Sequence, residues 1–281
     1  MSRLGPLFET LRAENRRAVI PYLVAGDPIE TLTVPLMHSL VEAGADIIEV
    51  GVPFSDPMSE GPTIQKGHER ALEGGTSLLS TLALVKQFRE TNTETPLVLM
   101  GYANPLERKG YAAVADACAE AGIDGLITVD LPPEEVGAMN TELQRQKIDN
   151  IFLISPTTSD ERVARITAQA SGFIYYVALK GVTGAGHLDT DAVEAHLSTV
   201  RQHTSLPVAV GFGIKDADTA ATVVECADAV VVGSALVDLV ANDLSSGGSH
   251  TSAISRAHSL ISSIRNGVNS VSYTHLRAHE T

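Results

Sequence analysis

The feature that most constrains this sequence is an eightfold alternation of short apolar runs with longer segments of helical period. Short runs of this kind are typical of strands buried on both faces by helices, so the alternation predicts a parallel sheet covered by helices. The expected strands span residues 18–24, 47–50, 97–100, 125–129, 151–154, 173–178, 208–210 and 229–232.

Helical period is clearest in the segments between these runs, at residues 31–43, 78–91, 111–121, 134–147, 160–170, 191–203 and 217–225, and again near 252–264. Eight strand and helix units favour closure into a single-domain α/β fold, the (β/α)8 TIM barrel. An open doubly wound sheet is the alternative. It calls for a glycine-rich dinucleotide turn after the first strand, and Ala25-Gly26-Asp27-Pro28 is not that turn.

The chain of 281 residues is within the usual size of one barrel domain. We expect the barrel to occupy residues 1–267 and residues 268–281 to form a C-terminal tail that is disordered or non-native. The reason is that the last eleven residues, VSYTHLRAHET, carry no apolar period.

Charge excludes some partners. Twenty Lys and Arg against 34 Asp and Glu give a formal net charge of −14, which disfavours nucleic acid and anionic membranes. The first twenty residues are interrupted by charges, unlike a secretory signal peptide, so we expect a cytoplasmic protein. Cys118 and Cys226 are too few for a disulfide framework or a structural zinc site.

No metal site is expected either. None of the nine histidines lies at the end of an expected strand, where a barrel places its ligands. His187, in the connection after the sixth strand, is the only histidine expected near the active-site face, and a surface role is the simpler interpretation for it.

Glu49 is the first candidate for chemistry. It ends the second expected strand, and alternation points it into the barrel if Ile47 also points inward. A buried carboxylate costs several kcal/mol unless it is paired or functional. The residue is therefore either a salt-bridged structural acid or a general acid/base with a raised pKa.

The connection after the second strand carries two more acids, Asp56 and Glu60, among prolines that restrict its backbone. Glu60 is placed to supply a second carboxylate to a substrate, and Asp56 to orient the loop. For either residue alone, a solvated position on the loop remains the alternative.

Two glycine turns indicate a phosphate site. Gly211-Phe212-Gly213 follows the seventh strand, and Gly233-Ser234 follows the eighth and opens a helix. Barrels often bind phosphate between these loops through backbone N–H groups and a helix amino end. Such a site would bind an anion on an acidic protein without Lys or Arg. The glycine-rich stretch 181–186 after the sixth strand adds further N–H donors and hinges.

These motifs together resemble the tryptophan synthase alpha subunit family along nearly the whole barrel. The resemblance is carried by PYLVAGDP at 21–28, EVGVPFSDP at 49–57, GPTIQ at 61–65, YANP at 102–105, GVTG at 181–184 and GFGI at 211–214. It implies retro-aldol cleavage of indole-3-glycerol phosphate to indole and glyceraldehyde 3-phosphate.

The resemblance also implies roles for individual residues. The catalytic residues would be Glu49, Glu60 and Tyr175, with Glu60 standing where the family has an aspartate. The residues matching the substrate pocket are Tyr22, Met100, Tyr102, Thr183 and Phe212, and those matching the phosphate site are Gly184, Gly213, Gly233 and Ser234. Leu179-Lys180 departs from the Arg followed by Ser or Thr of many relatives.

For partners, the resemblance implies a β subunit that carries pyridoxal phosphate, in an α2β2 heterotetramer, and no cofactor in this chain. Pro53, Asp56 and Asn104 would lie near the contact with that subunit. Two alternatives stay open. One is another phosphate-binding barrel such as a sugar-phosphate epimerase, and the other is a non-catalytic α-like subunit that only activates its β partner.

Overall fold

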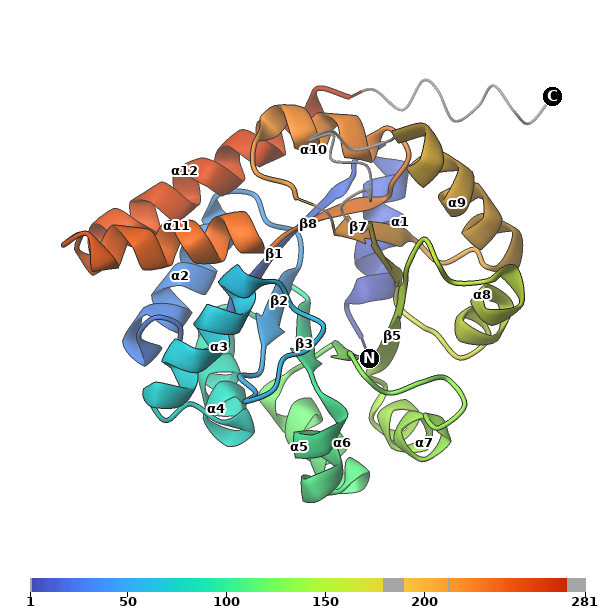
Figure 1. Cartoon of the computed structure of the whole chain (residues 1–281), viewed down its shortest axis with the longest axis horizontal. Coiled ribbons are helices and arrows are strands. Elements are labelled where there is room, and N and C mark those ends of the chain that lie inside the picture. The colour runs from blue at the N-terminus through green and yellow to red at the C-terminus, as the bar shows by residue number, and fades with distance from the viewer. Residues whose placement is uncertain (1, 179–189, 212, 272–281) are drawn as a thin grey trace.

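The fold is a closed barrel of eight parallel strands. The computed structural model describes residues 2–178, 190–211 and 213–271. Each strand pairs with the next, and β8 pairs with β1 (Figure 1). The strands are β1 (Ala18–Val24), β2 (Ile48–Gly51), β3 (Leu97–Gly101), β4 (Gly125–Thr128), β5 (Asp149–Ile154), β6 (Ile174–Val177), β7 (Val208–Gly211) and β8 (Ala229–Val232). The expected TIM barrel is confirmed.

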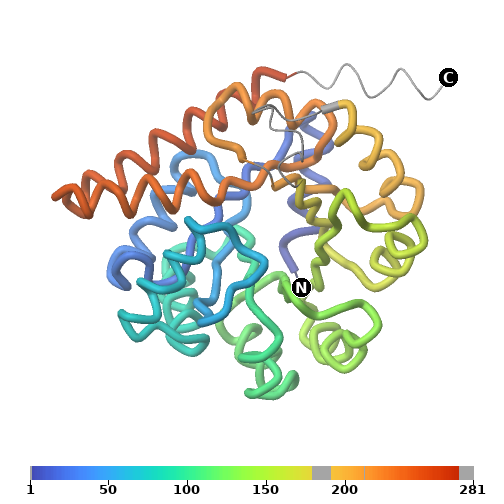
Figure 2. The backbone as a smooth tube through the Cα atoms, viewed as in Figure 1, coloured from blue at the N-terminus to red at the C-terminus, as the bar shows by residue number. Residues whose placement is uncertain are grey.

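Helices cover the outside of the barrel, apart from α1 at its amino-terminal mouth, and α11 and α12 lie side by side (Figure 2). They are α1 (Leu4–Ala13), α2 (Glu30–Glu42), α3 (Pro62–Glu73), α4 (Leu78–Arg89), α5 (Ala103–Lys109), α6 (Tyr111–Ala121), α7 (Gly137–Gln146), α8 (Asp160–Thr167), α9 (Thr190–His203), α10 (Ala217–Val224), α11 (Ser234–Ser245) and α12 (His250–Asn269).

Alternation along the strands divides the apolar residues into two cores. Ile20 and Tyr22 of β1 belong to the core inside the barrel, whereas Val19 and Leu23 belong to the core between the strands and the helices. Because side chains of a strand alternate between its faces, most strands contribute to both cores, whereas in β2 the inward positions are Glu49 and Gly51. Whether a strand residue can reach a site inside the barrel therefore depends on which face of the strand its side chain lies on.

Helix α1 closes the amino-terminal mouth of the barrel. Its buried residues Leu4, Phe8 and Leu11 belong to the inner core, and the ring centroids of Phe8 and Phe173 are 5.9 Å apart. The sequence patterns did not predict this helix. With this end closed, ligands must enter at the carboxyl ends of the strands.

The expected elements agree with the structure except at their edges. β1 and β8 have the expected bounds, and the other strands differ by one or two residues at an end. Helices α1, α3 and α5 lie in segments where no helix was expected, and α12 runs past the expected 252–264 to Asn269. Residues 272–281 lie outside the described residues. The expected boundary between the barrel and the C-terminal tail at residue 267 stays a prediction.

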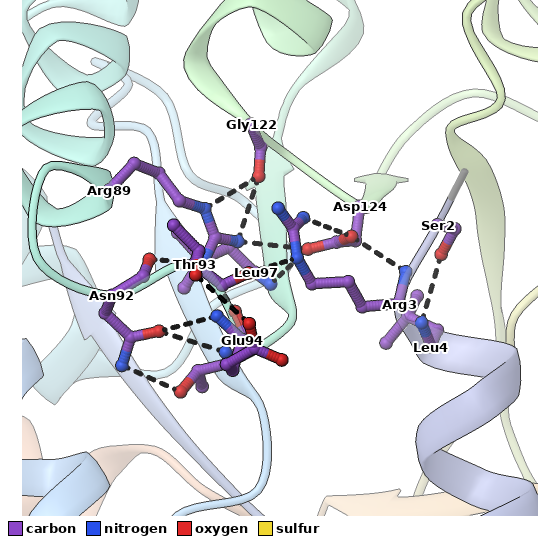
Figure 3. Close-up of polar contacts among 11 residues, drawn as sticks. Ser2, Arg3, Leu4, Arg89, Asn92, Thr93, Glu94, Leu97, Gly122 and Asp124 are labelled. Carbon is purple, nitrogen blue, oxygen red and sulfur yellow. Dashed lines mark hydrogen bonds and ion pairs between the residues drawn. The ribbon is translucent and has the colours of Figure 1, made fainter.

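A buried ion cluster supports the closed end. Asp124, 1 % exposed, precedes β4 and accepts hydrogen bonds from the backbone N–H groups of Arg3 and Leu97 at 2.9 Å (Figure 3). Its two oxygens also accept from the guanidinium groups of Arg3 at 2.8 Å and Arg89 at 3.1 Å. One carboxylate thus joins α1, α4 and the starts of β3 and β4.

We expect Asp124→Asn to lower the free energy of unfolding by about 3 kcal/mol, because it leaves a buried Arg89 without its counter-charge. Urea denaturation measures the change. The control is Glu120→Gln, which breaks an exposed pair with Lys86 and should leave the midpoint nearly unchanged. Equal midpoints for the two variants would contradict a structural role for Asp124.

Candidate active site

A cavity of about 630 Å³ opens at the carboxyl ends of the strands. Its walls come from β1, β2, β3, β6, β7 and β8 and from the connections that follow β2, β7 and β8. Residues from all of these parts line it, among them Tyr22, Glu49, Glu60, Met100, Tyr175, Gly213, Lys215, Gly233 and Ser234. The acids after β2 and the glycine turns after β7 and β8 therefore share one cavity.

Glu49 lies inside the barrel at this cavity. Ile47 belongs to the inner core and the neighbours Ile48 and Val50 to the outer one, so the expected condition for an inward Glu49 is met. The side chain is 1 % exposed, and its Oε1 has no hydrogen-bond partner among the described residues. Burial, and then the nearby charge of Glu60, raise the pKa of Glu49 to about 8.

Glu60 is the second acid of the cavity. It is half-buried, and burial raises its pKa to about 7. The titrations of two neighbouring carboxyls are coupled. As the pH rises, Glu60 ionises first, and the more deeply buried Glu49 keeps its proton at neutral pH. The cavity can thus present a proton donor and a proton acceptor at the same pH.

The loop that carries Glu60 is tied down on both sides. The Tyr102 ring stacks on Phe54 with centroids 4.9 Å apart, and its Oη accepts from the Ser59 backbone N–H at 3.3 Å. From α3, the Gln65 side-chain amide donates to the Glu60 carbonyl at 2.9 Å. These contacts fix the backbone at Glu60 before any ligand arrives.

Two tyrosines occupy matching places around the cavity. The ring of Tyr22 on β1 lies over Gly51 of β2, and the ring of Tyr175 on β6 lies over Gly211 of β7. A Cβ atom on either glycine would overlap the phenol oxygen of the tyrosine above it. Burial and the charges of both acids raise the pKa of each phenol well above its ordinary value. Both hydroxyls therefore stay protonated and can donate hydrogen bonds.

The opposite wall of the cavity is suited to an anion. Gly213 has a φ of +46°, a left-handed value that favours glycine. Gly233 is the N-cap of α11. Leu236 and Val237 donate the first hydrogen bonds of the helix, so the N–H groups of Ser234 and Ala235 come before these bonds, at the amino end of the helix. These amides and the helix dipole attract negative charge. Lys215 and Asp238 also line this cavity, one cation and one acid.

Comparison with known proteins identifies the family. A family model described as "Tryptophan synthase alpha chain" matches residues 8–267. The chain belongs to the tryptophan synthase alpha chain family. The resemblance noted from the motifs is confirmed, and with it the lyase class of the family.

Relatives of this family match most of the chain. The tryptophan synthase alpha chain of Thioalkalivibrio sulfidiphilus is 59% identical over 86% of this chain and 91% of its own. The protein of the same name from Dechloromonas aromatica is 51% identical over 96% of this chain and 99% of its own. The crystal structure of the alpha subunit from Legionella pneumophila superposes with a TM-score of 0.90 at 42% identity, covering 96% of this chain and 100% of that one.

Some residues expected from the family lie elsewhere or outside the described part. Thr183, Gly184 and Phe212 are not among the described residues. Of the expected interface residues, Asp56 and Asn104 are exposed at the open mouth, while Pro53 is buried. Their roles stay predictions, as do those of the cavity residues.

Sequence reasoning missed two residues of the site. His68 reaches it from α3, where its Nδ1 accepts from the Phe54 backbone N–H at 2.9 Å, so the expectation that His187 alone lay near this face was wrong. The search at strand ends excluded His68 because it lies on an unexpected helix. Lys215 was also missed, although it directly follows the GFGI motif.

Within residues 2–178, 190–211 and 213–271, no three His, Cys, Asp or Glu side chains are grouped to hold a metal ion. No helix in the same ranges has the length and apolarity needed to cross a membrane.

The raised pKa of Glu49 predicts a pH-dependent cost of folding. A folded pKa of about 8 above the ordinary 4.5 means that this cost is absent below about pH 4.5 and complete above pH 8. We expect Glu49→Gln to raise the free energy of unfolding by on the order of 3 kcal/mol near pH 8.5 and by little near pH 5. Urea denaturation at both pH values measures this. An equal gain at the two would rule out a buried, ionisable Glu49.

Proposed function

We propose that Glu49 and Glu60, assisted by Tyr175, are the catalytic residues of this alpha subunit. The chain is a lyase that cleaves indole-3-glycerol phosphate to indole and glyceraldehyde 3-phosphate for a β subunit that makes L-tryptophan. One observation carries the assignment of residues: an inward acid without a described partner shares a cavity with a second acid and with the amino end of α11.

The chemistry needs one proton delivered and one removed. Protonated Glu49 gives its proton to indole C3, which makes the ring an electron sink. The ionised Glu49 then takes the proton of the side-chain hydroxyl as the C3–C bond breaks, so that an aldehyde forms and the bond electrons restore the indole ring. The acid ends the cycle in its starting state. Tyr175 lines the same cavity, and its raised pKa keeps the phenol neutral, so it would donate a hydrogen bond to the reacting oxygen.

Glu60 would stabilise the charge that develops on the ring. Ionised near neutral pH, it can accept a hydrogen bond from the indole N–H, which becomes more acidic when C3 is protonated. The family aspartate is one methylene shorter. In this chain the Gln65 and Tyr102 contacts hold the loop that sets how far Glu60 reaches.

Binding of the substrate divides between the two walls. Tyr22 and Met100 line the cavity and would contact the indole, and Tyr102 holds the loop that carries Glu60. Gly213, Gly233 and Ser234 would hold the phosphate. The family resemblance adds Thr183 and Phe212 to the substrate pocket and Gly184 to the phosphate site, and these three lie outside the described residues. Lys215 would supply the positive charge that an acidic protein needs at that point.

The partner follows from the family. We expect a β subunit that carries pyridoxal phosphate, in an α2β2 heterotetramer in the cytoplasm, with Pro53, Asp56 and Asn104 near the contact. The proton transfers described above use only side chains, so we expect no cofactor in this chain. Indole would leave from the same open mouth that bears the exposed Asp56 and Asn104.

We expect Glu49→Gln to lower kcat for indole release by about a thousandfold, because the amide cannot deliver the proton. The measurement is an indole-release assay on indole-3-glycerol phosphate, with and without β subunit. Phosphate binding and the folded state should persist. Activity near that of the unmodified chain would refute the role of Glu49.

A second variant separates catalysis from a purely activating subunit. We expect the unmodified chain to release indole and Glu60→Asp to stay within about tenfold of it, since the shortened acid shifts by about one methylene. A silent unmodified chain together with an active Glu60→Asp variant would instead support a subunit that only activates its β partner.

For Lys215 we expect a selective effect on substrate binding. Lys215→Met should raise KM for indole-3-glycerol phosphate about tenfold at low salt with kcat nearly unchanged, and the difference should shrink near 1 M salt, where charges are screened within about 3 Å. Lys86→Met on α4, which removes an exposed cation away from the cavity, is the control. Equal KM values for the two variants would remove Lys215 from the phosphate site.

A further inference from the structure

His68 is a buried histidine that the reaction as described does not use. It lies on α3, which packs against β1 and α11, and it is 2 % exposed. Its place is between the loop after β2, which bears Glu60, and Tyr22 on the inner face of β1. A polar ring buried this deeply needs partners on both nitrogens or loses stability.

Both ring nitrogens have partners. The Phe54 backbone N–H donates to Nδ1 at 2.9 Å, and Nε2 is 3.4 Å from the Tyr22 Oη. Since a backbone amide can only donate, Nδ1 must be the unprotonated nitrogen. Burial lowers the pKa of His68 to about 4, so the ring is neutral at physiological pH and its one proton is on Nε2.

This arrangement fixes the direction of the second hydrogen bond. Nε2–H donates, and the Tyr22 oxygen accepts, at a distance at the long end for a hydrogen bond. The phenol's own proton is therefore free to be donated elsewhere. Tyr22 pairs with Glu49 in the β1 and β2 register and lines the cavity, so the groups placed to accept that proton are the carboxylates or a bound substrate.

We propose that His68 is a positioning residue: one neutral imidazole connects the backbone of the loop after β2 to the Tyr22 hydroxyl and so directs that hydroxyl's proton into the cavity. The inference rests on the proposed function of the site. It assigns His68 no contact with substrate. The ring instead couples the placement of the Glu60 loop to the hydrogen bond that Tyr22 can offer.

The test uses a variant that keeps one contact and removes the other. In His68→Asn the amide can occupy the place of Nδ1 and accept from Phe54, but it is too short to reach Tyr22. Tyr22→Phe removes the same hydrogen bond from the other side. We expect each variant to lower kcat about tenfold, with KM within about twofold, and the double variant to be no slower than either single one.

His38→Asn is the matched control. This histidine lies on α2, stacks on Phe88 with centroids 4.6 Å apart, and has its Nε2 3.2 Å from the Thr91 hydroxyl, away from the cavity. We expect unchanged kcat. Urea midpoints of all variants show that each is folded under the assay conditions.

A spectroscopic measurement tests the orientation of the ring directly. Side-chain ¹⁵N NMR of the full chain at neutral pH should show the His68 proton on Nε2 and an unprotonated Nδ1. A ring that only fills space would carry no such requirement. A proton on Nδ1 would overturn the proposal, because that nitrogen could then accept nothing from Phe54.

The kinetic outcomes are distinguishable. If the unmodified chain releases no indole, the proposed function fails. If it does release indole, and His68→Asn retains full kcat or the His68 and Tyr22 effects simply multiply, the positioning role fails while the proposed function stands. An effect confined to KM would also overturn it, since Tyr22 would then act only in binding.

Discussion

The site depends on the closure of the sheet, in which β1 pairs with β2 on one side and with β8 on the other. Closure brings the acid of β2 to the same cavity as the turns after β7 and β8, which are about 160 to 185 residues later in the chain. In an open sheet, β1 and β8 would not be joined and these groups would not share walls. Backbone pairing of β1 with both β2 and β8 thus holds the acid and the glycine turns around one cavity.

The buried acids Asp124 and Glu49, at opposite mouths of the barrel, are held in different ways. At the amino end, Asp124 accepts four hydrogen bonds and faces two guanidinium groups, and Asp46 is similarly held by Arg265 and the Val19 amide. At the carboxyl end, Glu49 is buried and its Oε1 has no partner among the described residues. The first arrangement stabilises the fold, whereas the second raises the pKa of an acid and costs stability. The acid proposed for proton transfer is therefore the one that is not held by a described cation.

Helix α3 holds the loop after β2 through two side chains. Gln65 and His68 lie on one side of this helix, three residues apart, and bond the backbone at Glu60 and at Phe54. The loop that bears the second acid is therefore held from outside the barrel as well as by Tyr102 from within it. Through His68 the same helix reaches Tyr22, so the placement of the loop and the hydrogen bonding of the inner tyrosine are linked.

The sequence alone determined the eight strands, because a strand buried on both faces needs an unbroken apolar run, and the motifs around them identified the family. It also placed Glu49 inward, conditional on Ile47, since alternation is local geometry. It missed α1, α3 and α5. The apolar side of α1 packs against the barrel mouth, and α3 packs against β1 and α11, so the contacts that explain these two helices exist only in the closed barrel. The cavity and the raised pKa values of Glu49 and Glu60 depend on tertiary structure, and so do the contacts and cavity lining on which the proposed roles of His68 and Lys215 rest. Burial and hydrogen bonding between segments far apart in the chain exist only once the barrel has closed.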